Sequence, residues 1–194
     1  MNFEETKSFQ NLAKAFAGES QARNRYVFAA AIAKKEGFQA IQSTFLSTAE
    51  NEQEHAKVFY KLLAKYAPDR NLIHVDADYP LAYGDTLANL KAAAAGEKEE
   101  WEVLYTNFAA IAEQEGLPEI QTAFRTIASV EKHHYQRYAE LAKAVETGTL
   151  FKKDSPIAWK CTNCGYVHHG TEAPHTCPAC VHPQGFFIDL PQNY

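Results

Sequence analysis

The residue types that could do chemistry occur twice in this sequence with the same spacing. Glu52 and His55 lie three residues apart, and Glu131 and His134 repeat that pair. Residues three apart in a helix lie about 60° apart on one face. Each pair falls on a stripe of apolar residues at helical spacing, which for the first pair includes Phe45. An ionised carboxylate in a core is costly unless it is paired or binds a metal, so a partner is expected there.

The composition argues against several classes of protein. The 194-residue chain has a net charge of −5 and no basic block, which argues against nucleic acid or an anionic membrane as a main partner. No run approaches the ~18 apolar residues of a transmembrane helix, and the acidic N-terminus lacks a secretory hydrophobic region. All four cysteines cluster near the C-terminus, which in a reducing compartment favours metal binding over disulfides. We expect a cytoplasmic protein with one sizeable domain and one small one.

Helical periodicity predicts four helices, and turn-forming residues fill the long connection at 68–83. The two halves repeat: Glu19 matches Glu97 with an offset of 78 residues, whereas Gly37 matches Gly116 with an offset of 79. Two helical hairpins joined by one long crossover indicate an all-α, ferritin-like four-helix bundle. The expected helices span about residues 6–36, 38–66, 84–115 and 118–146.

The repeat places Glu19 and Glu97 level with the two Glu-x-x-His pairs. One Glu from each of two helices, with Glu-x-x-His from each of the other two, is the ligand set of di-iron carboxylate bundles. A single such pair is usually a solvated helix pair, but two copies at repeat-related core positions favour a metal site. Glu100, where the first half has Ala22, adds a fifth carboxylate. A fifth hard oxygen ligand favours an oxidised iron pair, and His55 is the softer alternative.

Two tyrosines lie near this constellation. Tyr26 shares the helix face of Glu19, and Tyr105 lies near the face of Glu97. Each could donate a hydrogen bond to a ligand carboxylate, or could be an ordinary core tyrosine.

The C-terminal residues contain a second metal motif. Cys161-x-x-Cys164 and Cys177-x-x-Cys180 form two knuckles with the spacing of a structural metal site. About 38 residues cannot build a core unaided, so the metal must be structural at least. Four thiolates suit zinc, which would make a passive ribbon, or a single iron, which would make a one-electron carrier.

With both modules in place, the chain resembles the rubrerythrin family over essentially its full length. The predicted domains are therefore a di-iron bundle at 1–147, a linker at 148–156 and a small, β-rich, rubredoxin-like domain at 157–194. The stretches that carry the resemblance are Ala17-Gly18-Glu19-Ser20-Gln21-Ala22-Arg23-Asn24-Arg25-Tyr26, Glu52-x-x-His55-Ala56-Lys57, Gly96-Glu97-x-x-Glu100, Glu131-x-x-His134, Cys161-x-x-Cys164-Gly165-Tyr166 and Cys177-Pro178-Ala179-Cys180.

The resemblance implies a peroxidase that reduces hydrogen peroxide to water in oxidative-stress defence. It implies an iron pair, oxo-bridged when oxidised, in which one iron trades the Glu100-type carboxylate for the His55-type imidazole on redox change. Electrons would return through the iron of the four cysteines, supplied by rubredoxin or an NAD(P)H-dependent rubredoxin reductase. Zinc could also be bound at these sites in place of iron. The implied di-iron ligands are Glu19, Glu52, His55, Glu97, Glu100, Glu131 and His134.

The length of the last helix suggests how the two centres meet. From His134 to the helix end near Glu146 is 12 residues, or ~18 Å, and the linker adds more. Electron tunnelling decays steeply with distance, so we expect a head-to-tail homodimer, as the resemblance also implies.

Two other classes of function remain open. Iron storage is one, although storage needs no dedicated electron port. A zinc-loaded interaction protein is the other, and it would be colourless, whereas iron in four thiolates is red.

Overall fold

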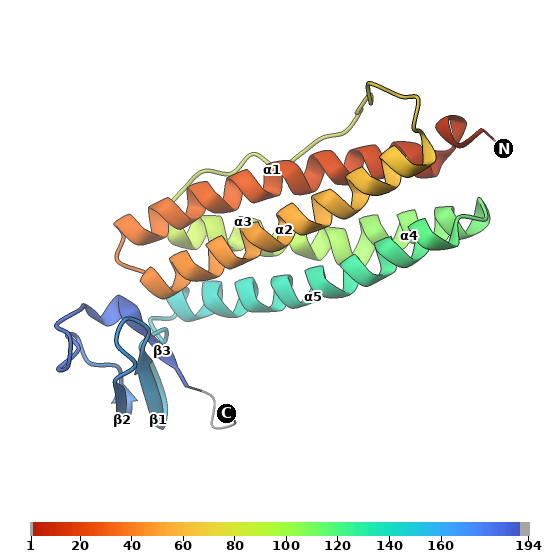
Figure 1. Ribbon diagram of the computed structural model, residues 1–194. Coiled ribbons are helices and arrows are strands. Elements are labelled where there is room, and N and C mark those ends of the chain that lie inside the picture. Colours follow the sequence, from red (N-terminus) through yellow and green to blue (C-terminus); the bar gives the residue numbers. More distant parts are fainter. Residues whose placement is uncertain (1, 191–194) are drawn as a thin grey trace.

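The structure is a computed structural model of the chain in which residues 2–190 are described. Long helices lie side by side in a bundle, and a small strand domain sits at one end (Figure 1). The helices are α1 (Lys7–Lys35), α2 (Gln39–Tyr66), α3 (Thr86–Glu99), α4 (Tyr105–Gln114) and α5 (Pro118–Glu146), with a π-helical turn at Glu100–Leu104. The strands are β1 (Lys152–Cys161), β2 (Val167–Glu172) and β3 (Phe187–Asp189).

The hairpin turns of the bundle repeat as the sequence predicts. Gly37 ends the α1–α2 turn with φ +86°, and Gly116 does the same before α5 with φ +72°. Glycine adopts this left-handed conformation without steric cost, which explains why a glycine is repeated at both turns. The long crossover then runs back along α1 (Figure 1). The predicted four-helix bundle with one long crossover is confirmed.

The third predicted helix, expected at about 84–115, runs from Thr86 to Gln114, but it is not α-helical throughout. It is divided by the π-helical turn at Glu100–Leu104. A π-helical turn accommodates one extra residue within an otherwise α-helical run. The offset between the halves grows from 78 at Glu97 to 79 at Gly116, so this turn absorbs the added residue.

The apolar core is split into two clusters along the bundle axis. One cluster contains Leu12, Phe59 and Phe124, and the other contains Phe45 and Tyr138. The ligand-type side chains of the helices belong to neither cluster. The buried polar layer therefore lies between two well-packed apolar layers, which hold the helices in register.

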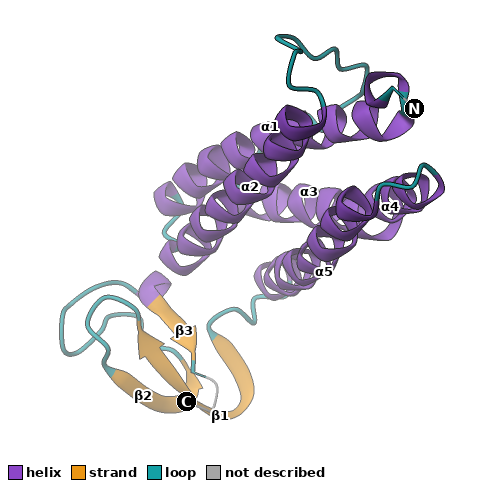
Figure 2. Cartoon of the chain, turned by 45° about the vertical axis from the view of Figure 1, so that its right-hand side comes forward, coloured by secondary structure: helices purple, strands orange, loops and turns teal. Residues whose placement is uncertain are grey.

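The small domain is a three-stranded antiparallel sheet of order β2-β1-β3 packed around Trp159 and Phe187. Figure 2 shows this sheet beyond the ends of α2 and α5. The strand β1 begins at Lys152, which pairs with Glu172, so the strand extends into the stretch expected to be a linker. The exact domain boundaries stay a prediction.

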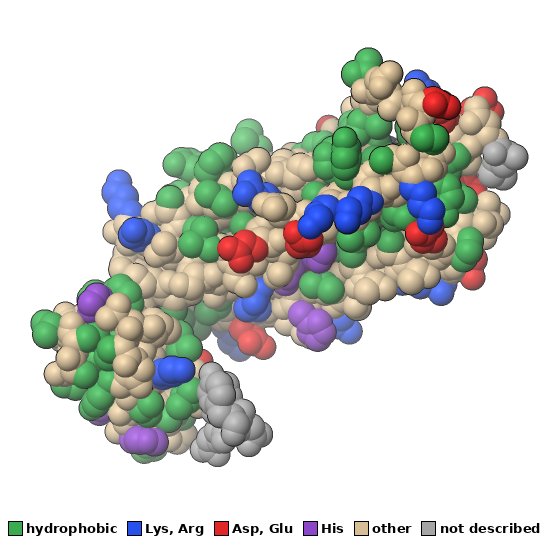
Figure 3. All heavy atoms as spheres, in the orientation of Figure 1, with side chains coloured by type: hydrophobic (Ala, Val, Ile, Leu, Met, Phe, Trp, Pro, Cys, Tyr) green, Lys and Arg blue, Asp and Glu red, His purple; other side chains and the backbone are tan. Residues whose placement is uncertain are grey.

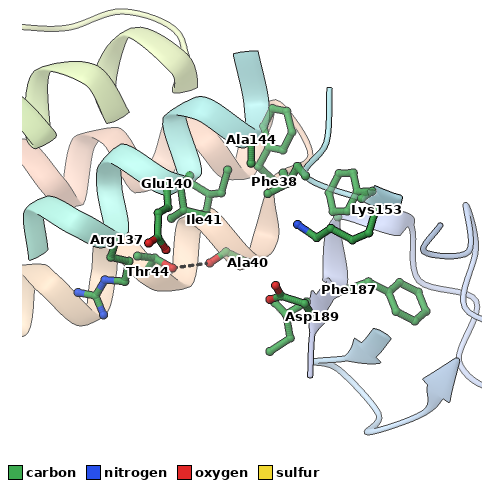
Figure 4. A pocket seen from close by; sticks show the side chains of 15 residues that line it. Phe38, Ala40, Ile41, Thr44, Arg137, Glu140, Ala144, Lys153, Phe187 and Asp189 are labelled. Carbon is green, nitrogen blue, oxygen red and sulfur yellow. Dashed lines mark hydrogen bonds between the residues drawn. The ribbon is translucent and has the colours of Figure 1, made fainter. Parts of the chain in front are cut away.

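The small domain touches the bundle at the α1–α2 turn. A Cβ placed on Gly185 would lie 1.7 Å from the carbonyl oxygen of Gly37, so only glycine fits there. Beside this contact is a cavity of about 340 Å³. Figure 4 shows Lys153 and Asp189 on the small-domain side of it, and Arg137 on α5.

Charged side chains are spread over the visible surface of the bundle. Figure 3 shows acidic and basic groups interspersed on that face. Among the described residues, none of the helices combines the length and apolarity that a membrane-spanning segment needs.

Candidate metal centres

Every helical stretch that flanks the polar layer contributes a side chain to it. Glu19 comes from α1, Glu97 from α3 and Glu100 from the π-helical turn, while α2 and α5 each contribute a Glu-x-x-His pair. The carboxylates of Glu19, Glu52, Glu97 and Glu131 are at most 1% exposed. Burial of this many carboxylates in one layer is strongly unfavourable without compensating positive charge.

The donor atoms form two overlapping groups. Glu19 and His55 complete one group, and Glu97 and His134 complete the other. Both groups also contain Glu52 and Glu131, and the donor atoms of each lie within 4.8 Å of one another. Two carboxylates shared by two adjacent groups are what a pair of bridged cations requires.

The histidines contact the shared carboxylates directly. Nδ1 of His55 lies 2.8 Å from Oε1 of Glu131 and 2.9 Å from Oε2 of Glu52. Nδ1 of His134 lies 2.6 Å from Oε2 of Glu131 and 3.2 Å from Oε1 of Glu52. Each imidazole nitrogen thus faces the same two carboxylates from opposite ends of the site.

Among the described residues, five buried carboxylate oxygens of the site have no hydrogen bond of regular geometry: Oε2 of Glu19, Oε1 of Glu52, Oε2 of Glu97 and both oxygens of Glu131. Two of them, Oε2 of Glu19 and Oε2 of Glu97, also lie more than 3.5 Å from the imidazole nitrogens that face them. Buried acceptors are normally paired, so both atoms need a partner. Carboxylate and imidazole donors suit iron, and the residues present therefore fit an iron pair.

Protons take up the charge of the site when it binds no cation. Burial alone would raise the pKa of Glu52, but hydrogen bonds from His134 and His55 outweigh it and lower that pKa to about 2. Burial also opposes protonation of His134, yet the nearby carboxylates of Glu131, Glu52 and Glu97 raise its pKa to about 11. Burial raises the pKa of Glu97 to about 8. The imidazoles and carboxylates of the site therefore stabilise one another's charged forms.

The two tyrosines bond across the bundle. Tyr105 donates to Oε1 of Glu19 at 2.5 Å, and Tyr26 donates to Oε1 of Glu97. The sequence places each tyrosine near the glutamate of its own helical stretch, whereas each bonds the glutamate of the other half. The expectation that they are hydrogen-bond donors to carboxylates is met, with the partners exchanged.

Glu100 stands apart from both donor groups. It belongs to neither group of close donor atoms, and its side chain is half-buried, unlike the four fully buried glutamates. Burial raises its pKa, as do the nearby charges of Glu19 and Glu97. The π-helical turn begins at Glu100. The second half therefore gains its one extra residue beside the position where it has Glu100 and the first half has Ala22.

The four cysteines meet at the end of β1. Their sulfurs lie within 4.8 Å of one another, with Cys161–Cys180 at 3.8 Å and Cys164–Cys177 at 3.7 Å. The two knuckles share one geometry. Gly165 donates its N–H to the carbonyl of Cys161, and Val181 does so to Cys177, both with positive φ. Four converging thiols fit one tetrahedral metal.

The comparisons with known proteins agree with both centres. The family model described as rubrerythrin matches residues 10–142, and the one described as the rubrerythrin rubredoxin-like domain matches 159–188. The chain belongs to the rubrerythrin family. It therefore has a ferritin-like di-iron site with carboxylate and histidine ligands and a rubredoxin-like four-cysteine site, and it is an oxidoreductase of a family associated with oxidative stress.

Relatives within the rubrerythrin family cover nearly the whole chain. It is 52% identical to rubrerythrin-1 of Clostridium acetobutylicum, with 97% of each chain covered. It is 43% identical to rubrerythrin of Nitratidesulfovibrio vulgaris over 97% of each. A solved structure of partially reduced nigerythrin is similar with a TM-score of 0.64 and 29% identity, covering 98% of this chain and 94% of that one.

Proposed function

We propose that this protein is a peroxidase that reduces hydrogen peroxide to two water molecules, using two electrons and two protons. Bound iron supplies the two electrons, one from each ion of the pair. The observation that carries the proposal is the pair of donor groups that share Glu52 and Glu131, together with a separate four-cysteine centre in the same chain. A two-electron site combined with a one-electron centre suits reduction of a small oxidant.

The donor groups suggest a role for each ligand. Glu52 and Glu131 would contribute to both metal positions, because each belongs to both groups. Glu19 and His55 would hold one iron, and Glu97 and His134 the other. Cys161, Cys164, Cys177 and Cys180 would hold the third iron.

Glu100 and His55 are proposed as conditional ligands. His55 lies against the bridging carboxylates in the donor group, and Glu100 lies outside it. An oxygen ligand of negative charge favours the more highly charged oxidised pair, and imidazole suits the reduced pair. Glu100 would therefore bind when the site is oxidised, and His55 when it is reduced.

Electron delivery is proposed to occur between two copies of the chain. The helix α5 runs 12 residues beyond His134, or ~18 Å, before the small domain begins. Figure 1 shows that domain at the end of the bundle, away from its middle. A head-to-tail homodimer would bring the four-cysteine centre of one chain to the iron pair of the other. A rubredoxin or an NAD(P)H-dependent rubredoxin reductase would supply the electrons.

A coupled assay tests this function. The iron-loaded protein is mixed with NADH, a rubredoxin reductase and hydrogen peroxide, and NADH loss is followed. We expect peroxide-dependent oxidation of one NADH per peroxide, and none with the Cys164→Ser variant. Turnover by a protein that remains monomeric throughout would contradict the dimer, and absence of turnover in the wild type would contradict the peroxidase.

A further inference from the structure

A cavity of about 300 Å³ lies against the outer side of the metal layer. Its walls come from α1, from the crossover and from the stretch between α3 and α4. Glu100 and Tyr105 both line it, and these are the glutamate that stands outside the donor groups and the tyrosine that bonds Glu19. The full lining is Lys14, Ala15, Gly18, Arg25, Ala77, Asp78, Tyr79, Pro80, Gly96, Glu99, Glu100, Leu104, Tyr105 and Phe108.

Two repeat-related glycines leave this space open. Gly18 precedes Glu19, and Gly96 precedes Glu97. A Cβ at Gly96 would meet nothing within 4 Å, and a Cβ at Gly18 would meet the ring of Tyr79 at 3.5 Å. Glycine weakens a helix interior relative to alanine, so these positions keep room at some cost to the helices.

The crossover forms the roof of the cavity. Tyr79 lies over Gly18 and donates its hydroxyl hydrogen to the carbonyl of Lys14 at 3.0 Å. Arg25 donates to the carbonyl of Pro80 at 3.2 Å. The Tyr79 side chain is 36% exposed, so part of it faces solvent while its ring covers α1. These hydrogen bonds attach the crossover to α1 where it covers the cavity.

The floor of the cavity is the half-buried Glu100. The other four glutamates are at most 1% exposed, so the metal layer is closed except where Glu100 and His55 retain exposure. Glu100 is the ligand proposed to leave iron when the irons are reduced. Peroxide that enters through the cavity would therefore arrive where a metal ligand has been released.

We propose that this cavity is the access chamber for peroxide and that Tyr79 limits the size of the hydroperoxide that reaches Glu100. This inference rests on the proposed peroxidase function. The chamber has room for several waters, so its volume alone would admit a small hydroperoxide, and the covering side chain of Tyr79 would set the size limit. For any hydroperoxide, the O–O bond breaks and two electrons from the irons with two protons give water and an alcohol, or two waters from hydrogen peroxide.

Two variants and two matched controls test the chamber. Gly96→Leu fills it, and Ala95→Leu adds the same side chain at the adjacent exposed position outside the lining. Tyr79→Ala opens the roof, and Tyr83→Ala removes another exposed crossover tyrosine that does not line it. Stopped-flow spectroscopy measures reoxidation of the reduced, iron-loaded proteins by hydrogen peroxide and by tert-butyl hydroperoxide.

We expect Gly96→Leu to lower the second-order rate constant for hydrogen peroxide at least about tenfold, with iron content and the rate at saturating peroxide unchanged. We expect Tyr79→Ala to raise the rate constant for tert-butyl hydroperoxide about tenfold relative to that for hydrogen peroxide. Both controls should behave as the wild type.

Unchanged selectivity in Tyr79→Ala would overturn the inference, as would equal losses in Gly96→Leu and Ala95→Leu. If Gly96→Leu binds no iron, the Tyr79→Ala comparison decides alone. Failure of the wild type to react with hydrogen peroxide would instead contradict the peroxidase function itself.

Discussion

Tyr105 donates a hydrogen bond to Glu19, 86 residues earlier in the chain, at 2.5 Å. Tyr26 makes the reciprocal bond to Glu97, 71 residues later. Each half of the repeat therefore orients a carboxylate of the other half. A hydrogen bond to a ligand carboxylate fixes its orientation and tunes its basicity, so the site depends on correct docking of the two hairpins.

Removing one of these hydroxyls should weaken the site. We expect Tyr105→Phe to lower the peroxide reoxidation rate or the iron affinity by about 10–100-fold, since loss of such a partner typically has that effect. Iron titration and stopped-flow kinetics measure both quantities. Tyr66→Phe is the control, because that hydroxyl bonds the exposed Glu119 instead. Equal behaviour of the two variants would contradict the role of Tyr105.

Removing the fifth carboxylate should make the two halves alike. Glu100→Ala places alanine where the first half has Ala22. We expect the variant to bind two ferrous ions through the remaining donors and to react with peroxide about 10–100-fold more slowly, because the oxidised pair loses an oxygen ligand. Glu102→Ala, which changes an exposed carboxylate of the same π-helical turn that does not line the cavity, is the control. An unchanged reaction rate in Glu100→Ala would contradict the proposal that Glu100 is an iron ligand.

Metal binding should release protons. Burial opposes protonation of His134, but the nearby carboxylates of Glu131, Glu52 and Glu97 raise its pKa to about 11, and the pKa of His55 is raised as well, so the site without metal favours protonated imidazoles. A nitrogen that binds iron must lose its proton. We expect at least two protons released per chain and an affinity that falls as pH falls. Calorimetry in two buffers of different ionisation enthalpy measures the number, and His55→Ala should release about one proton fewer.

The stabilisation of the first turn of α1 by Glu115 should depend on pH. Glu115 accepts hydrogen bonds from the backbone N–H groups of Lys7 and Ser8, both at 2.9 Å. Burial raises the pKa of Glu115, but hydrogen bonds from Ser8 and Lys7 outweigh it and lower that pKa below 4.5. The stabilisation is therefore present above pH 4.5 and lost as the pH falls through the lowered folded pKa.

We expect Glu115→Gln to lower the free energy of unfolding of the metal-free protein by about 1 kcal/mol at pH 7. The difference from the wild type should shrink as the pH falls below 4.5. Urea unfolding at a series of pH values measures it, with Glu113→Gln as the control because that side chain is exposed. A difference that stays constant with pH would contradict the capping role.

Much of the bundle could be predicted from local pattern and repetition. The span of α5 agrees with the prediction at both ends, and the repeat located Glu19 and Glu97 from the two Glu-x-x-His pairs. The π-helical turn at Glu100–Leu104 was missed, although the change of offset from 78 to 79 was its signal. Periodicity over a long window averages such a local insertion away.

Relationships across the bundle could not be predicted in this way. The reach of Tyr26 to Glu97 depends on how the hairpins dock, and helix angles describe only one helix at a time. The contact of Gly185 with Gly37 depends likewise on the placement of a separate domain. No spacing in the sequence predicts either the Tyr26–Glu97 hydrogen bond or the Gly185–Gly37 contact.

The most direct test of the peroxidase function is anaerobic titration of the fully reduced, iron-loaded protein with hydrogen peroxide. Each chain should hold three irons that give one electron each, and peroxide accepts two, so about 1.5 equivalents should restore the oxidised visible spectrum. Reoxidation should also be faster with peroxide than with oxygen. A reduced spectrum that peroxide leaves unchanged would contradict the function.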